Sequence, residues 1–410
     1  CMDGACIASF PLINAMAPHV FTYICPAHSI DNFLKNVCSD KAVIRVKSLD
    51  RDFDWDEDEF SDCIDQVWDA IKFVLYHQKA LARYRALADE VPRDKRPVGG
   101  TELLRYVDTR FASKVLMLIR YRNVLPILDK LFVDNDFTKW ASKQSRDVKD
   151  KAATAKRTVR DESIIDTVKT CIRVLEPAVV LLRMLDGKDG ATLGKIYGYT
   201  LQVDAFYKAP IKGLHDRLRK KIHTLFMARW EYFHVPVMTA AYRFEPEYCR
   251  RDFTPAETKE VRAVLRQMSN SEHPYTALLS DLADYEEALA CQSYDLSEEY
   301  AFSENARKMT SYKWAKVYLA PWKHLCWAAM RLLSMHCSAS GCEHAWSVEG
   351  WIHSKKRNRL GQKTVERLVR SHTNLLLESQ LDEWQSAMLP WELEMIPADI
   401  DEAEADSESE

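Results

Sequence analysis

The sequence predicts a mixed α/β, predominantly helical protein. The chain has 410 residues, of which only 11 are glycine and 15 are proline, so helix-breaking residues are scarce. Apolar residues recur at helical spacing over most of its length, whereas the one strongly strand-like run lies near the start. A length of 410 residues predicts two or three domains rather than a single core.

The first 40 residues hold the expected α/β part. Residues 4–16 are expected to form a short helix. The β-branched and aromatic run 19–25 predicts a buried strand, and Pro26 then begins a helix that continues through Val37. The chain begins with Cys1 rather than Met and shows no secretory leader, so we interpret its start as lying within a longer protein.

An acidic stretch follows over residues 50–65. It differs from a calcium-binding loop, because Trp55 occupies the position of the required glycine and Ser61 that of the final glutamate. Acidic residues favour the positive end of a helix dipole. We therefore expect a solvated linker that leads into the N-terminus of a helix.

Helical patterns dominate from there onwards. Apolar residues share one helical face over 64–81 and again over 164–182. Thr254, Pro255 and Glu257 predict a helix start with a capping box. Residues 143–160 hold seven basic residues against two acids, which predicts a basic linker or an exposed helix.

Charge and cysteine usage restrict the class of protein. The net charge is -4, but the last twelve residues hold seven acids and no base, so the remainder is mildly basic and compatible with a nucleic-acid partner. No run of 18 apolar residues occurs, so no membrane span is expected. The 11 cysteines follow no disulfide framework, which predicts reduced thiols inside the cell.

One partial zinc pattern is present. Cys25 and His28 could supply half of a tetrahedral site. The other half would come from a second cluster some 310 residues later, formed by His336, Cys337, Cys342 and His344. Neither cluster is complete at close spacing, so the sequence disfavours zinc.

The C-terminal part carries an ordered set of motifs. Small residues at 338–341 precede Cys342-Glu343-His344-Ala345-Trp346-Ser347, then come Arg357-Asn358-Arg359-Leu360 and an amphipathic helix over 363–380. This set resembles the C-terminal signature of hAT DNA transposases, in which Ser-Glu-Arg-x-Phe-Ser precedes Arg-x-x-Leu and a dimerisation helix. The sequence departs from that pattern at Cys342, His344 and Trp346.

Three further segments resemble the plant-type branch of the same family, in the family's order. Residues 2–6, with Cys25 and His28, resemble its Thr-Asp-Asn-Ala-Ser and Cys-x-x-His stretch. Residues 108–113, which contain Arg110, resemble its Thr-Arg-Phe-x-Ser motif, and 229–246 resemble its Arg-Trp and Ala-x-x-Leu-Asn-Pro stretch. The resemblance covers most of residues 1–378.

The resemblance implies a partial ribonuclease-H-like core interrupted by a long all-α insertion. Residues 1–45 would form the partial core and 46–310 the helical insertion. Residues 311–380 would return to the core and contain the dimerisation region, and 381–410 would form an acidic disordered tail.

Members of the family cut and join DNA with an Asp-Asp-Glu triad that holds Mg²⁺ or Mn²⁺ between two reacting oxygens. By motif position, Asp3 resembles the second Asp and Glu343 the final Glu. The alternatives are that Asp3 has no role and that Glu343 is a surface carboxylate paired with Arg331 or Lys355. The first Asp would lie before Cys1, so we expect these 410 residues alone not to cut DNA.

A basic run and a helix complete the predicted sites. The run could contact DNA phosphates, form a nuclear localisation patch or be a solvated loop, and we favour phosphate contact; its residues are Lys355, Lys356, Arg357 and Arg359. The dimerisation helix presents an apolar stripe of Val365, Leu368, Val369 and Leu376. An aromatic of the family's insertion can stack on a flipped base, but for Trp140, Trp230 and Trp314 core packing is the favoured interpretation.

The predicted function is metal-dependent DNA cleavage and strand transfer in the intact protein, as a nuclear homodimer or higher oligomer. The alternative is a domesticated, catalytically inactive relative that keeps the fold, the association with DNA and the dimer interface.

Overall fold

The computed structural model describes residues 4–39, 42–46, 51–55, 57–97, 99–107, 112–186, 191–339, 346, 348–350, 352 and 360–383. The chain divides into two compact units. The first comprises residues 1–37, 41–56 and 175–341, and the second comprises 38–40, 57–174 and 342–410. No helix in the described ranges is long and apolar enough to cross a lipid bilayer.

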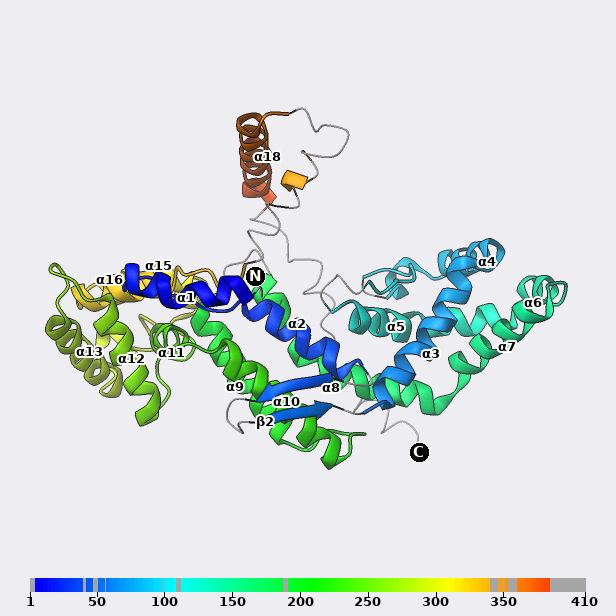
Figure 1. The fold of residues 1–410 in the computed structure, drawn as a ribbon, viewed down its shortest axis with the longest axis horizontal. Helices are drawn as coiled ribbons and strands as arrows, with labels where there is room; N and C mark the ends of the chain where they lie inside the picture. The colour runs from blue at the N-terminus through cyan, green and yellow to red at the C-terminus, as the bar shows by residue number, and fades with distance from the viewer. Residues whose placement is uncertain are drawn as a thin grey trace. The chain divides into compact units, whose positions relative to one another are not determined.

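Helices make up most of the described chain (Figure 1). The elements are α1 (Gly4–Met16), α2 (Pro26–Val37), β1 (Ala42–Val46), β2 (Arg51–Trp55), α3 (Glu59–Tyr76), α4 (Gln78–Asp89), the short 3-10 turn η2 (Arg93–Lys95), α5 (Ser113–Val133), α6 (Asn135–Ala141), α7 (Arg146–Arg160), α8 (Glu162–Asp186), α9 (Leu193–Lys208), α10 (Asp216–Phe233), α11 (Pro236–Phe244), α12 (Pro255–Met268), α13 (Tyr275–Ala290), the turn η3 (Tyr294–Leu296), α14 (Glu304–Arg307), α15 (Ser311–Tyr318), α16 (Lys323–Leu332) and α18 (Gln362–Glu383).

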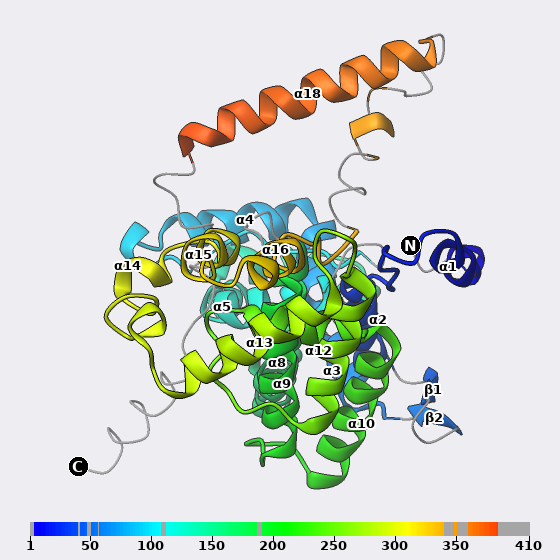
Figure 2. The same cartoon turned by 90° about the vertical axis from the view of Figure 1, so that its left-hand side faces the viewer.

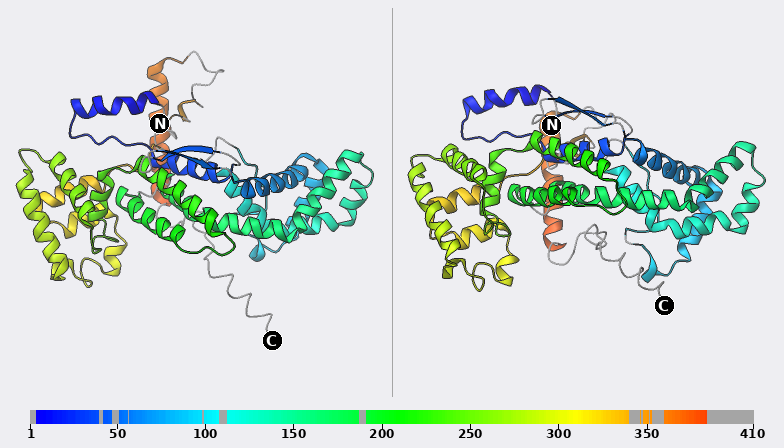
Figure 3. Two further views of the ribbon diagram at one scale, coloured as in Figure 1. Left: turned by 60° about the horizontal axis from the view of Figure 1, so that its bottom comes forward. Right: turned by 90° about the horizontal axis from the view of Figure 1, so that it is seen from below.

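The predominantly helical prediction is confirmed, but the described residues do not show the α/β core. Their one sheet is an antiparallel hairpin in which Ala42 pairs with Trp55 and Val46 with Arg51. The hairpin contacts α10 (Figure 3). Strand β2 occupies part of the acidic stretch, where we expected only a linker, so that expectation is wrong for 51–55.

The predicted buried strand at 19–25 is also wrong. Residues 20–25 have no regular secondary structure, and among the described residues no strand pairs with them. The Gln267 side-chain amide donates to the Pro18 carbonyl at 2.7 Å and lies 3.5 Å from the carbonyl of Val20. A run rich in β-branched residues predicts extended backbone, yet a ladder also requires a neighbouring strand.

The two N-terminal helices match the predicted ranges, and α2 enters the core of the first unit. Phe33 of α2 packs edge-on against Phe226 of α10, with ring centroids 5.5 Å apart, and Tyr207 of α9 lies 5.4 Å from Phe226. All three side chains are fully buried. Arg229 of α10 also donates to the Asn36 side chain at 2.7 Å, which ties α10 to the end of α2.

Helices α9 and α11 pack so closely that glycine is required between them. A Cβ at Gly194 would lie 2.7 Å from the carbonyl oxygen of Ala241 and 2.9 Å from the nitrogen of Tyr242. A Cβ at Gly198 would lie 2.4 Å from the ring of Tyr248. Neither distance is possible for a side-chain carbon, so both positions exclude even alanine without movement of the neighbours.

Helix α12 begins as the sequence predicts. Thr254 caps it and Glu257 completes the capping box, with Pro255 in the first turn. Its apolar residues Val261, Val264, Leu265 and Met268 are buried. Helix α12 packs against α11 and α13, and α13 in turn packs against α16 (Figure 2).

The second unit contains helices α3 to α7. The helical pattern over 64–81 is divided by His77, whose extended backbone separates α3 from α4. An aromatic cluster joins α3, α5 and α6, with Phe132 5.4 Å from Phe137 and Phe73 6.4 Å from each. The basic segment forms helix α7, which is not a linker: its small apolar residues Ala152, Ala155 and Val159 are buried and α7 packs against α3.

The compact units combine residues from different predicted domains. The described part of residues 4–37 lies in the same unit as 191–339, whereas 57–97 and 112–174 lie in the other. The boundary near residue 175 falls within α8. The domain limits at 45, 310 and 380 stay a prediction.

Candidate functional site

All of the predicted catalytic and DNA-contacting residues, and Arg110 of the predicted core motif, lie outside the described part of the chain. The catalytic and DNA-contacting residues are Asp3, Glu343, Lys355, Lys356, Arg357 and Arg359. Of the predicted dimerisation residues, Leu376 belongs to α18 but its side chain is not among those described. These assignments stay predictions.

The structure describes Cys25 of the predicted core motif and its contacts. Cys25 is buried at the start of α2, and its sulfur accepts a hydrogen bond from the backbone N–H of Ala339 at 3.4 Å. The Tyr23 hydroxyl donates to the carbonyl oxygen of His336. Burial raises the pKa of Tyr23 to about 12. The segment before α2 is thus joined to residues 336–339, which the sequence separates by more than 300 positions.

Two buried cysteines, Cys25 and Cys337, lie at this junction. Burial, together with the neighbouring Cys25, raises the pKa of the Cys337 thiol to about 11. His28 lies half-buried on α2. Within the described ranges, no three His, Cys, Asp or Glu side chains come together as a metal site requires.

A buried carboxylate fixes the start of α15 to α9 and α11. Glu245 follows α11 and is fully buried. It accepts hydrogen bonds from the hydroxyls of Thr192, which caps α9, and Ser311, the first residue of α15. Burial raises the pKa of Glu245, although both hydroxyl donors and the nearby Lys195 oppose that shift.

The buried side of α15 is anchored by Trp314. Its side chain is 1% exposed, and its indole N–H donates to the carbonyl of Ala301 at 2.6 Å. The rings of Phe302 and Tyr318 each lie 5.7 Å from it. Trp314 is therefore a core residue, in agreement with the favoured interpretation, and Trp140 and Trp230 are half-buried.

The other side of α15 and the residues just before it present apolar groups to solvent. Met309, Tyr312 and Val317 are 38%, 40% and 46% exposed. Met309 precedes α15, whereas Tyr312 and Val317 lie on its exposed side, where Lys313 and Lys316 are also exposed. This surface was not predicted from the sequence.

Helix α18 carries a second exposed apolar stripe. Val365 is buried and Val369 half-buried, whereas Leu368 is 41% and Leu375 65% exposed. At 100° per residue these four positions fall within one third of the helix circumference. Two leucines on one stripe of a surface helix leave apolar area that a partner could cover.

Residues 287–375 match the family model of the hAT family C-terminal dimerisation region. The match contains both the α15 face and the described α18 stripe, and it includes Glu343 of the predicted triad. No curated protein matches the chain. This match supports the resemblance drawn from the C-terminal motifs, and the matched region is one described as a dimerisation region.

Proposed function

We propose that this protein is hAT transposase-like and that two copies associate through α18. One observation carries the proposal: the exposed leucines of α18 lie inside the segment that matches the hAT dimerisation region. In a two-fold dimer the same patch occurs on both copies, so each buried leucine contributes twice. Burial of a leucine side chain contributes about 1.5–3 kcal/mol.

The α18 stripe suits a symmetric interface better than the α15 face does. Lys313 and Lys316 stand among the exposed apolar residues of α15. Lysine is depleted in interface cores, and a two-fold contact would bring like charges together. The stripe of α18 holds Leu368, Val369 and Leu375, with the exposed His372 between them and no lysine.

The finer proposal is metal-dependent DNA cleavage and strand transfer in the intact protein, in the nucleus, as in the plant-type branch. Asp3 and Glu343 would hold Mg²⁺ or Mn²⁺, which prefer carboxylate oxygens, and the basic run 355–359 would neutralise phosphates. The junction of Cys25 with Ala339 supports this proposal, because a core interrupted by an insertion requires its two parts to meet.

Self-association is tested by co-expressing the full chain with two different affinity tags. We expect each tag to recover the other copy, and Leu375→Asp to abolish that recovery. Asn374→Asp is the matched control, because Asn374 is exposed on the opposite half of α18 and gains the same charge. Equal recovery with Leu375→Asp would exclude α18 as the interface.

Catalysis is tested separately, by nicking of supercoiled plasmid by the intact protein with Mg²⁺ or Mn²⁺. The proposal expects nicking that Glu343→Gln abolishes. Dimers that bind DNA but leave the plasmid uncut would favour the alternative, an inactive DNA-associated dimerisation protein.

A further inference from the structure

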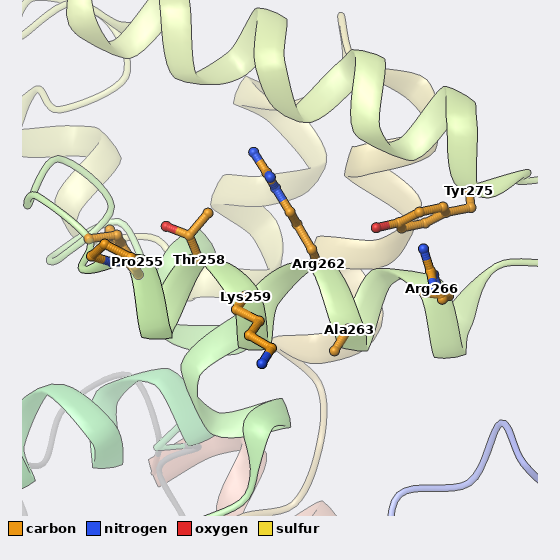
Figure 4. A pocket seen from close by; sticks show the side chains of 8 residues that line it. Pro255, Thr258, Lys259, Arg262, Ala263, Arg266 and Tyr275 are labelled. Carbon is orange, nitrogen blue, oxygen red and sulfur yellow. The ribbon is translucent and has the colours of Figure 1, made fainter.

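A groove runs along α12 in the first unit. Its volume is about 620 Å³, and residues from α12, the preceding loop and the start of α13 line it. Three of the lining residues are cations and two are aromatic: Lys259, Arg262, Arg266, Phe253 and Tyr275. Figure 4 shows Arg262 extending from α12, Lys259 leaving the helix in another direction, and Tyr275 beside Arg266.

The three cations form an exposed row. Lys259, Arg262 and Arg266 stand at i, i+3 and i+7, so they lie within 60° of one another around the helix and span about 10 Å along it. Consecutive phosphates of one strand are about 3.4 Å apart along the axis when the bases are stacked as in a duplex, and farther apart in an extended single strand. A row of about 10 Å is long enough to contact two neighbouring phosphates in either case.

The acidic residues of α12 face other partners. Glu257 accepts from the Thr254 backbone N–H at 2.8 Å and from the Tyr197 hydroxyl at 3.0 Å. Glu260 accepts from the Thr239 hydroxyl at 2.5 Å and lies 3.6 Å from His234. Among the described residues, none of the three groove cations forms an ion pair with a carboxylate. Lys259 and Arg262 are exposed, whereas Arg266 contacts the ring of Tyr275.

The aromatic residues are held in place at the two ends of the row. The guanidinium of Arg266 lies 4.8 Å from the ring centroid of Tyr275, and that of Arg243 lies 4.5 Å from the ring of Phe253. Both rings are half-buried, so each keeps some surface open. Fixed rings beside a row of cations are the features that bind unpaired nucleotides, whose bases stack while their phosphates pair with basic groups.

We propose that this groove binds single-stranded DNA, with Lys259 and Arg262 on consecutive phosphates and a base stacked at Tyr275. Thr258, also in the lining, can donate a hydrogen bond to a phosphate oxygen. The inference rests on the proposed function, because it takes DNA as the substrate. It adds that the bound DNA is single-stranded and names the residues that bind it. In a duplex the faces of the bases are stacked on one another, and an acidic peptide has no bases to stack. Neither ligand would therefore use both the cations and the aromatic rings of the groove.

The test is fluorescence anisotropy of a short labelled oligothymidylate with the full chain. We expect Lys259→Ala with Arg262→Ala to weaken binding about tenfold or more and to reduce the salt slope by about 1.4, since each single-strand phosphate contact contributes about 0.7. The matched control is Arg217→Ala with Lys220→Ala. It removes the same two residue types at the same i, i+3 spacing from an exposed part of α10.

Tyr275 tests the stacking separately from the charge. Tyr275→Ala is expected to weaken oligothymidylate binding about tenfold without changing the salt slope, whereas Tyr275→Phe should retain binding. Equal loss in the groove and control double variants would show a net-charge effect and overturn the proposal. So would unchanged binding with Tyr275→Ala, or equal competition by duplex DNA or polyglutamate.

Co-recovery of tagged copies is measured on the same variants. Loss of oligonucleotide binding with intact self-association supports the groove. If the wild-type chain self-associates but does not bind the oligothymidylate, the groove proposal is wrong and the proposed dimer is unaffected.

Discussion

The sulfur of Cys25 accepts a hydrogen bond at 3.4 Å from the backbone N–H of Ala339, 314 positions later in the chain. The Ser338 hydroxyl beside it donates to the carbonyl of Leu185 at 2.5 Å. The segment that enters α2, the end of α8 and the segment that leaves α16 therefore meet in one unit. Helices α9 to α16, which lie between Leu185 and Ser338 in the sequence, belong to the same compact unit.

Replacement of Trp314 should be among the more destabilising single changes. Trp314→Ala removes a buried indole and is expected to lower the free energy of unfolding by about 3–5 kcal/mol. Trp314→Phe should cost less, because it loses the hydrogen bond to Ala301 but keeps a ring. Urea unfolding followed by circular dichroism measures both. Trp346→Ala is the control, since Trp346 is 57% exposed and should change stability by under about 0.5 kcal/mol.

Gly194→Ala should destabilise the contact between α9 and α11. The new Cβ would meet backbone atoms of Ala241 and Tyr242, which no rotamer change can move, so we expect a loss of about 3 kcal/mol. The melting temperature reports the loss. Gly361→Ala meets no atom within 4 Å and should leave the melting temperature nearly unchanged. Equal melting temperatures for the two variants would contradict the packing described.

Burial of Glu245 should make the free energy of unfolding depend on pH. Burial raises its pKa above the ordinary 4.5, so the folded state holds a proton that the unfolded state releases, and stability falls as pH rises through the folded pKa. Glu245→Gln removes that titration. The stability of Glu245→Gln relative to the wild type should therefore increase from about pH 4 towards neutrality. Urea unfolding over this range measures it, and a difference that decreases with pH would contradict the assigned burial.

Local signals in the sequence predict much of the helical structure. The Thr254–Glu257 capping box and the ends of α1 and α2 depend on adjacent residues, and the structure has them where the pattern indicates. The run 19–25 was misassigned because strand formation depends on a distant partner strand, and the described residues contain none beside it. The hairpin β1–β2 was missed because acidic alternation also fits a solvated linker.

The candidate sites also differ in whether they depend on a local sequence pattern or on a long-range contact. The stripe of α18 is a local pattern, and its helix forms where the sequence predicts it. The groove on α12 joins Arg266 to Tyr275 across the turn between two helices, so periodicity within one helix could not reveal it. The meeting of Cys25 with Ala339 is a long-range contact that follows from tertiary packing alone.

Light scattering of the purified chain over a range of concentrations tests the central claim most directly, because it measures the molar mass of the assembly in solution. One chain has a mass of 47.4 kDa. We predict about twice that mass for the wild type and for Asn374→Asp, and the mass of one chain for Leu368→Asp and Leu375→Asp, each of which places a charge on the apolar stripe. A wild-type chain that stays monomeric at high concentration, or a dimer that both aspartate variants leave intact, would contradict association through α18.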